Sequence, residues 1–349
     1  MHFAFVDITY GYAVDRPEAP EALGGTTTAL CFLARALRAD GHDCTIFNKV
    51  SAPTAAHGIA SLPLEQLTTE RSNLAYDVFI FVGRWADWLV THIAEAARVP
   101  LIAWMHESQF DLPFVPQMDA FNAVVFVSDW QARINQATLL PQQSRTVIRN
   151  ALSPAIAALF PPDRAITANK TPTAVYVGAT PRGLLHLPTL WPLLQAVRPD
   201  LTLQIFANPA PSRDTAINAS LAEQLRALPG VTHLGQVGQP ALAQALAEAS
   251  FFLAPNPFPE TSCIALMEAL AAGLCAITTD RAALPETAHG FATLCPIAAA
   301  DDPALFTQPF DAAAFAARAL PVIADRCDHP AVWEPRLREQ VSYFQTHYR

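Results

Sequence analysis

Short apolar runs along this chain alternate with longer segments whose apolar positions recur at helical spacing. The runs that we interpret as buried strands of a first series are His2 to Asp7, Cys44 to Asn48, Asp77 to Gly83, Pro100 to Met105, Ala123 to Ser128 and Arg145 to Arg149. A second series comprises Ala174 to Gly178, Leu201 to Ala207, Val231 to Leu234, Ser250 to Ala254, Leu274 to Thr279 and Phe291 to Cys295. The helices expected between them include Thr27 to Ala39, Trp85 to Arg98, Ala241 to Ala249 and Cys263 to Ala272. Such alternation predicts an α/β protein with parallel sheets.

A proline-rich segment, 151–172, separates the two series and is the best candidate for a linker. We therefore expect an N-terminal domain over 1–155, a second domain over 156–330 and a closing helix over 331–349 that packs back towards the first domain. Each domain has the size of a doubly wound, Rossmann-like unit, and such sheets bind ligands at the carboxyl ends of their strands. The two domains are expected to face each other across a ligand-binding cleft.

Composition narrows the possible classes of protein. Hydrophobic residues make up 52% and charged residues 15% of the 349 positions, which excludes a disordered chain. The net charge of -9 is spread over both halves, so neither is a basic surface for nucleic acid. No apolar run is long enough to span a membrane, and the N-terminus lacks the pattern of a secretory signal, so a cytoplasmic protein is expected. The six cysteines have no metal-ligand spacing and are expected to be reduced, buried thiols.

The richest chemistry lies in the segment Leu253 to Gly273. A strand is followed by Glu260 and by Thr261, Ser262 and Cys263, which are expected at the N-terminus of a helix, where backbone N–H groups bind phosphate. Glu268 follows on that helix and could accept hydrogen bonds from the vicinal hydroxyls of a ribose. The alternatives are that Glu260 is merely a favourable charge at a helix start and that Glu268 is a solvated helix residue.

The spacing of these residues resembles the donor-binding signature of retaining GT-B glycosyltransferases of the glycosyltransferase family 4 type, the glycosyl transferases group 1. That signature is Glu, seven residues, Glu, then Ala-x-Ala-x-Gly. It is matched by Glu260, Glu268 and Ala269 to Gly273. The resemblance implies a GT-B fold, in which two Rossmann-like domains face each other.

Other segments follow in the order that the family requires. Gly24, Gly25 and Thr26 resemble the loop that approaches a phosphate or acceptor, and His106 resembles a histidine that faces the donor. Gly178 and Arg182 lie where relatives carry Gly-Arg and then Lys-Gly; the first cation is missing here, and Arg182 stands at the lysine position. Two alternatives remain open: Gly24-Gly25 could form an ordinary turn, and His106 could be a structural residue at the end of a strand.

The resemblance implies a retaining hexosyltransferase of bacterial type that acts in glycan or glycolipid biosynthesis. Glu260, Arg182 and His106 are then the catalytic residues. Gly178, Arg182, Glu260, Thr261, Ser262, Cys263 and Glu268 bind a UDP- or GDP-sugar donor. Because the chain has no Asp-x-Asp, neither a metal nor another cofactor is expected.

The acceptor is expected to be a carbohydrate or a lipid-linked molecule, with an apolar rim formed by 10–23 and 110–121. Peripheral contact with the inner face of a membrane stays open. Three alternatives are a binding subunit that needs a partner, a GT-B-like epimerase and a phosphorylase. A dinucleotide dehydrogenase is disfavoured because neither strand series opens with Gly-x-Gly-x-x-Gly.

Overall fold

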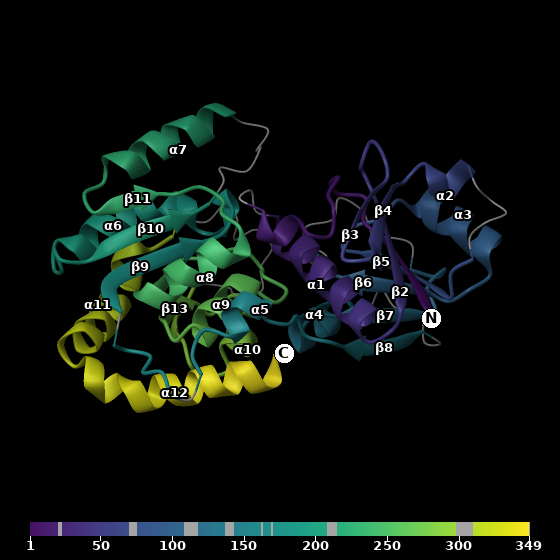
Figure 1. The fold of residues 1–349 in the computed structure, drawn as a ribbon. Coiled ribbons are helices and arrows are strands. Elements are labelled where there is room, and N and C mark those ends of the chain that lie inside the picture. The colour runs from purple at the N-terminus through teal and green to yellow at the C-terminus, as the bar shows by residue number, and fades with distance from the viewer. Residues whose placement is uncertain are drawn as a thin grey trace. The chain divides into compact units, whose positions relative to one another are not determined.

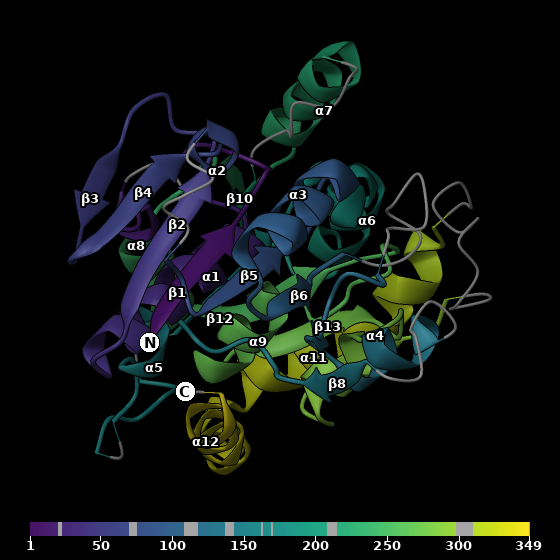
Figure 2. The same ribbon diagram turned by 90° about the vertical axis from the view of Figure 1, so that its right-hand side faces the viewer.

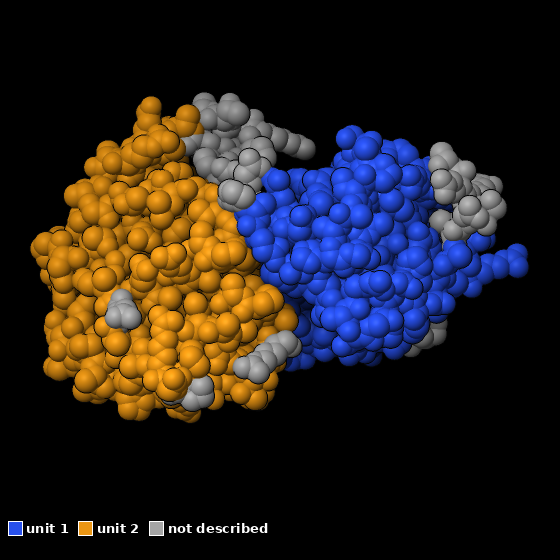
Figure 3. Space-filling view, viewed as in Figure 1, with its two compact units in different colours: residues 1–150 blue, residues 151–349 orange. Residues whose placement is uncertain are grey.

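The computed structural model of the protein describes residues 1–19, 23–69, 75–107, 118–136, 143–161, 163–168, 170–207, 215–297 and 310–348. The chain divides into two compact units, Met1–Asn150 and Ala151–Arg349 (Figure 3). Each unit has its own sheet. The division falls close to the proline-rich segment, where the sequence predicts a boundary after residue 155. Most of the acceptor rim expected over 110–121 lies outside the described residues. The cleft expected between the domains stays a prediction.

The first unit contains a sheet of order β3-β4-β2-β1-β5-β6-β7-β8. Figure 2 shows the run of neighbouring strands from β3 to β6. Its strands are β1 (His2–Val6), β2 (Asp43–Asn48), β3 (Thr54–Ala56), β4 (Ile59–Pro63), β5 (Val78–Val82), β6 (Leu101–Met105), β7 (Ala123–Phe126) and β8 (Ser144–Val147). All neighbours pair in parallel except β3 and β4, which are antiparallel. The α-helices are α1 (Gly25–Ala39), α2 (Gln66–Thr69), α3 (Asp87–Ala97) and α4 (Asp129–Ile134), and η1 (Arg16–Glu18) is a short 3-10 turn.

The second unit contains an all-parallel sheet of order β11-β10-β9-β12-β13-β14. Its strands are β9 (Thr171–Val177), β10 (Thr202–Phe206), β11 (Val231–His233), β12 (Ala249–Ala254), β13 (Cys275–Thr279) and β14 (Thr293–Cys295). Counted within the unit, this is the order 3-2-1-4-5-6 of a Rossmann sheet, which reverses direction between β9 and β12. Every residue of β12 is buried, because helices cover both faces of such a sheet.

Helices surround this second sheet (Figure 1). They are α5 (Pro154–Ala157), α6 (Leu187–Gln195), α7 (Thr215–Ala227), α8 (Gln239–Glu248), α9 (Ile264–Ala271), α10 (Leu284–Ala288), α11 (Ala312–Asp328) and α12 (Pro330–His347), with the 3-10 turns η3 (Thr180–Arg182) and η4 (Leu184–His186). No helix in the described part of the chain is long and apolar enough to cross a membrane.

The closing helix α12 packs within the second unit. The Gln340 side chain donates to the carbonyl oxygens of Leu270 and Leu274 at 2.8 and 3.1 Å, and Phe344 lies in the core beside α9. The amide of Leu152 donates to the carbonyl of Tyr348 at 2.7 Å. These contacts tie both ends of the unit together. The expected contact of this helix with the first domain stays a prediction.

Candidate functional site

The loops that follow β9 and β12 meet at the carboxyl edge of the second sheet, where the strand order reverses. Gly183 has a φ of +110°, and a Cβ atom there would lie 2.4 Å from the carbonyl oxygen of Pro255. A side chain is therefore excluded by both backbone conformation and space. Gly178, one of the predicted donor residues, lies in the same loop, and a Cβ there would stand 3.7 Å from that of Arg182. The close approach of the loops brings their side chains together.

Arg182 and Glu260 form an ion pair across these loops. Their Nε and Oε1 atoms lie 2.9 Å apart, and the Glu260 side chain is 9% exposed against 42% for Arg182. The guanidinium also lies over the ring of Phe258, with Cζ 4.8 Å from the ring centroid. Such a partner offsets the cost of several kcal/mol that desolvation imposes on an ionised carboxylate. Glu260, which is predicted to bind the donor sugar, and Arg182, which is predicted to bind the phosphate, are thus direct neighbours.

The helix after Glu260 starts differently from the sequence expectation. It begins at Ile264, and its N-cap is Cys263 rather than Thr261 or Ser262. Cys263 has a φ of +48°, an uncommon conformation for a residue other than glycine, and makes no side-chain cap hydrogen bond. Thr261 and Ser262 are buried in the turn before the helix, and Thr287 Oγ1 donates to the carbonyl of Ser262 at 2.6 Å. The expected Thr/Ser cap is therefore wrong, because the left-handed residue, not a hydroxyl, turns the chain into α9.

Glu268 is buried inside α9 with 3% of its surface exposed. Burial raises the pKa of its carboxyl to about 7, while neighbouring Ser153 and Gln239 oppose that rise. No lysine or arginine among the described residues forms an ion pair with it. A solvated helix residue is therefore excluded. Its neighbours, Ser153 and Gln239, differ from those of Glu260, so the two acids lie in separate environments.

The predicted residues of the first unit also gather at a carboxyl edge. Gly24 is the N-cap of α1, and Gly83 follows β5 with a φ of +66°. A Cβ at Gly83 would lie 3.6 Å from Thr26 Cγ2 and 4.0 Å from His106 Cβ, so Thr26 and His106 are neighbours. Burial lowers the pKa of His106 to about 3, which keeps its imidazole neutral at physiological pH.

Three residues of these edges were missed by the sequence interpretation. Gly83 could have been identified from the sequence, because it ends a predicted strand and ligands bind at strand ends. Asn256 and Arg281 gave no such signal: Asn256 is 2% exposed, and Arg281 is fully buried with Nε donating to the carbonyl of Pro257 at 3.2 Å. Arg281 is enclosed, and its hydrogen bond supports the loop that carries Glu260.

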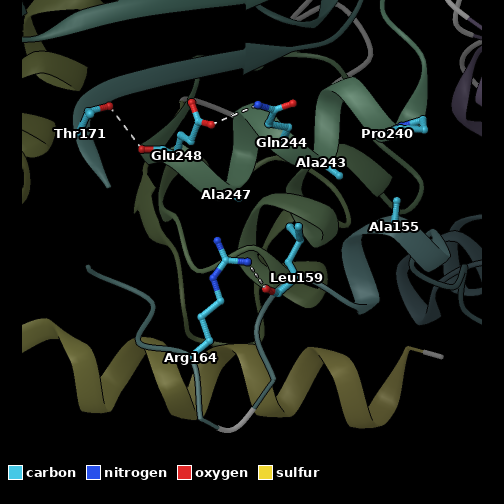
Figure 4. A pocket seen from close by; sticks show the side chains of 9 residues that line it. All are labelled: Ala155, Leu159, Arg164, Thr171, Pro240, Ala243, Gln244, Ala247 and Glu248. Carbon is cyan, nitrogen blue, oxygen red and sulfur yellow. Dashed lines mark hydrogen bonds between the residues drawn. The ribbon is translucent and has the colours of Figure 1, made fainter. Parts of the chain in front are cut away.

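Two surface hollows lie apart from these residues. One of about 600 Å³ lies in the second unit by α8 and the first residue of β9, at the amino edge of the sheet (Figure 4). Figure 4 shows the Arg164 guanidinium bonded to the carbonyl of Leu159, with Gln244 bonded to Glu248 on the opposite wall. The other, of about 700 Å³, is lined by Gly11 to Ala19 and His57 of the first unit. Neither is lined by a predicted catalytic or donor-binding residue, but the second is lined largely by the segment 10–23 that is expected to form part of the acceptor rim.

The second unit matches a known family over the residues that build its carboxyl edge. Residues 171–327 match the family described as glycosyl transferases group 1. These residues form a glycosyl transferases group 1 domain. The matched range includes Gly178, Arg182, Glu260 and Glu268, and the family expected from the acidic spacing is confirmed. A comparison of the sequence with curated proteins gives no match.

Solved structures resemble the glycosyl transferases group 1 domain together with the first unit. Sucrose-phosphate synthase from Thermosynechococcus elongatus is 17% identical with a TM-score of 0.73, over 100% of this chain and 95% of that one. HepE from Anabaena, in complex with UDP-glucose, is 15% identical with a TM-score of 0.67 over the same shares. The catalytic domain of starch synthase IV from Arabidopsis thaliana, bound to ADP and acarbose, is 12% identical with a TM-score of 0.62, over 98% and 95%. The chain therefore has the GT-B fold of glycosyltransferases, as expected.

Proposed function

We propose that this glycosyltransferase moves a sugar from a UDP- or GDP-sugar to an acceptor hydroxyl, with retention of configuration at the anomeric carbon. The observation that carries the proposal is the carboxyl edge of the second sheet. There Arg182 and Glu260 form an ion pair at 2.9 Å beside the strand-order reversal. Both residues lie in the range 171–327 that matches the family. Open parallel sheets bind nucleotides at this position.

Each residue of the edge has a proposed part in donor binding. Glu268 accepts hydrogen bonds from the ribose hydroxyls, because a buried carboxylate with no basic partner favours donors supplied by a ligand. The turn from Thr261 to Cys263 and the start of α9 receive a phosphate. Glu260 accepts from the donor sugar. The solved structures with UDP-glucose in HepE and with ADP in starch synthase IV support a nucleotide in this type of fold.

The proposed reaction exchanges one bond at the anomeric carbon for another on the same face. The bond from that carbon to the diphosphate oxygen breaks, the bond to the acceptor oxygen forms, and the acceptor proton passes to the departing diphosphate. Arg182 stabilises the charge that develops on the diphosphate, which is an electrostatic form of catalysis. His106 contributes a neutral imidazole that can donate one hydrogen bond to the donor.

We further propose that the reaction needs neither a metal nor a cofactor. The acceptor is proposed to be a carbohydrate or a lipid-linked molecule. Metal independence rests on the lack of an Asp-x-Asp in the sequence. Glycan or glycolipid biosynthesis is the proposed setting, with peripheral contact to a membrane surface where the acceptor is lipid-linked.

A turnover assay tests the catalytic assignment. Release of nucleoside diphosphate from a panel of UDP-, GDP- and ADP-sugars is measured with EDTA present, and no loss of rate is expected. Arg182→Ala should lower turnover by about 100-fold or more, the usual effect of removing one such electrostatic group. Arg182→Lys keeps the cation and should retain most of the rate. Wild-type turnover in Arg182→Ala, or restoration of an EDTA-inhibited rate by Mn²⁺, contradicts the assignment.

A further inference from the structure

Asn256 closes the loop that carries Glu260. It follows β12 and Pro255, and both ends of its buried amide are used. Its Oδ1 accepts from the backbone N–H of Phe258 at 2.9 Å, and its Nδ2 donates to Glu260 Oε1 at 3.2 Å. One side chain therefore sets the bend of the loop and also contacts the functional carboxylate.

The backbone of this loop is held by the last residue of β13 and by the segment that follows that strand. Thr279 Oγ1 donates to the carbonyl of Asn256, and Arg281 Nε donates to that of Pro257. The amide of Ala283 donates to the carbonyl of Glu260 at 3.1 Å. Because the main chain is held on both sides of Glu260, the orientation of its carboxylate depends on the side chains that bond it.

Both side-chain partners of Glu260 contact the same oxygen, Arg182 as an ion pair and Asn256 as a hydrogen-bond donor. Arg182 Nε lies 2.9 Å and Asn256 Nδ2 3.2 Å from Oε1. In the described part of the chain, no residue bonds Oε2. A carboxylate oxygen retains two acceptor positions, so Oε2 is suited to a hydroxyl of a ligand.

We propose that Asn256 is a positioning residue of the donor-sugar site, which holds Glu260 Oε1 so that Oε2 accepts a hydroxyl of the donor sugar. This rests on the proposed function. Asparagine suits the position because its amide supplies one acceptor and one donor on a short stem. Aspartate would keep the acceptor for Phe258 but place a carboxylate against that of Glu260. Serine would keep an acceptor but is too short to reach Glu260.

The test compares how much the sugar adds to nucleotide affinity in the full-length protein. UDP, GDP and ADP and their glucose conjugates are titrated into the wild type by calorimetry, and the pair that binds is used for the variants. Asn256→Asp should lower affinity for the sugar conjugate about tenfold or more, as expected for loss of a hydrogen bond to a charged group. Affinity for the bare nucleotide should change less than about twofold, because Glu268 binds that part.

Asn48→Asp is the matched control. Asn48, the last residue of β2, is also fully buried, with Oδ1 accepting from the backbone N–H of Val50 at 3.1 Å and Nδ2 donating to the carbonyl of Tyr12 at 2.8 Å. It belongs to the first unit, whereas Glu260 belongs to the second, so its variant should lose stability but keep the ratio of the two affinities. If Asn256→Asp does not fold, Asn256→Ser provides the same comparison with a smaller expected change.

A double-mutant cycle separates positioning from general damage. In a Glu260→Ala background, Asn256→Asp should lower sugar-conjugate affinity no further. A parallel loss of both affinities in Asn256→Asp, or full additivity in the cycle, overturns the positioning role while leaving the nucleotide site intact. Failure of every nucleotide to bind the wild type overturns the proposed function itself and this inference with it.

Discussion

At the scale of single residues, the acid most changed by the fold is Glu268. Burial raises its pKa to about 7 from the ordinary value of 4.5. Between these two pH values the native state holds a proton that the unfolded state releases, so this residue makes the free energy of unfolding fall as pH rises from 4.5 to about 7. A pKa shift of this size changes the free energy of unfolding by on the order of 3 kcal/mol across this pH range.

Glu268→Gln should remove that dependence. The free energy of unfolding is measured by urea titration at several pH values. Between pH 4.5 and about 7 it should fall less steeply in the variant than in the wild type. Nucleotide affinity of the wild type should rise through about pH 7 as the carboxylate forms, whereas that of the variant should stay flat. Equal slopes in the two proteins would show that Glu268 keeps an ordinary pKa.

Sequence reasoning at this scale found residues of recognisable spacing and missed those defined by contacts. Glu260 and Glu268 were found because seven residues separate them. The contact of Arg182 with Glu260 joins residues 78 positions apart, and the roles of Asn256 and Arg281 depend on loops that meet only in the folded sheet. No local pattern carries that information.

At the scale of elements, most strands were predicted to within a few residues, because a strand of a parallel sheet is a short, continuous apolar run. The exceptions are β3 and β4, which form an antiparallel pair at the sheet edge and whose sequences, TAA and IASLP, lack such a run. The start of α9 lies one residue from the predicted Cys263, but Thr261 and Ser262, which have the composition of a cap, lie in the turn before it.

The meeting of the β9 and β12 loops can be tested at Gly183. Gly183→Ala should destabilise the protein by more than about 1 kcal/mol and weaken nucleotide binding, because a Cβ atom meets the Pro255 carbonyl and the φ is unfavourable. Gly235→Ala is the control, since Gly235 has a φ of +74° but open space around it. Chemical denaturation measures both. Equal losses would show that the approach to Pro255 adds nothing.

At the scale of the whole molecule, two largely parallel sheets each carry candidate site residues at a carboxyl edge. The order of elements along the sequence predicted this class of fold, because each strand and its crossover helix follow one another in the chain. The pattern did not predict how segments as distant as 178–183, 255–263 and 280–283 converge. That convergence depends on the strand order, in which β9, β12 and β13 lie next to one another in the sheet. In the chain, β10 and β11 separate β9 from β12.

The central claim is that the carboxyl edge of the second sheet binds a nucleotide, and a thermal-shift titration with UDP, GDP, ADP and their sugar conjugates tests it most directly. A ligand that binds only the native state raises the unfolding temperature by mass action, and no acceptor is needed. We predict that one base raises the transition of the wild type and that Glu268→Ala abolishes this shift. No shift at millimolar ligand, or an unchanged shift in Glu268→Ala, would contradict a nucleotide site at this edge.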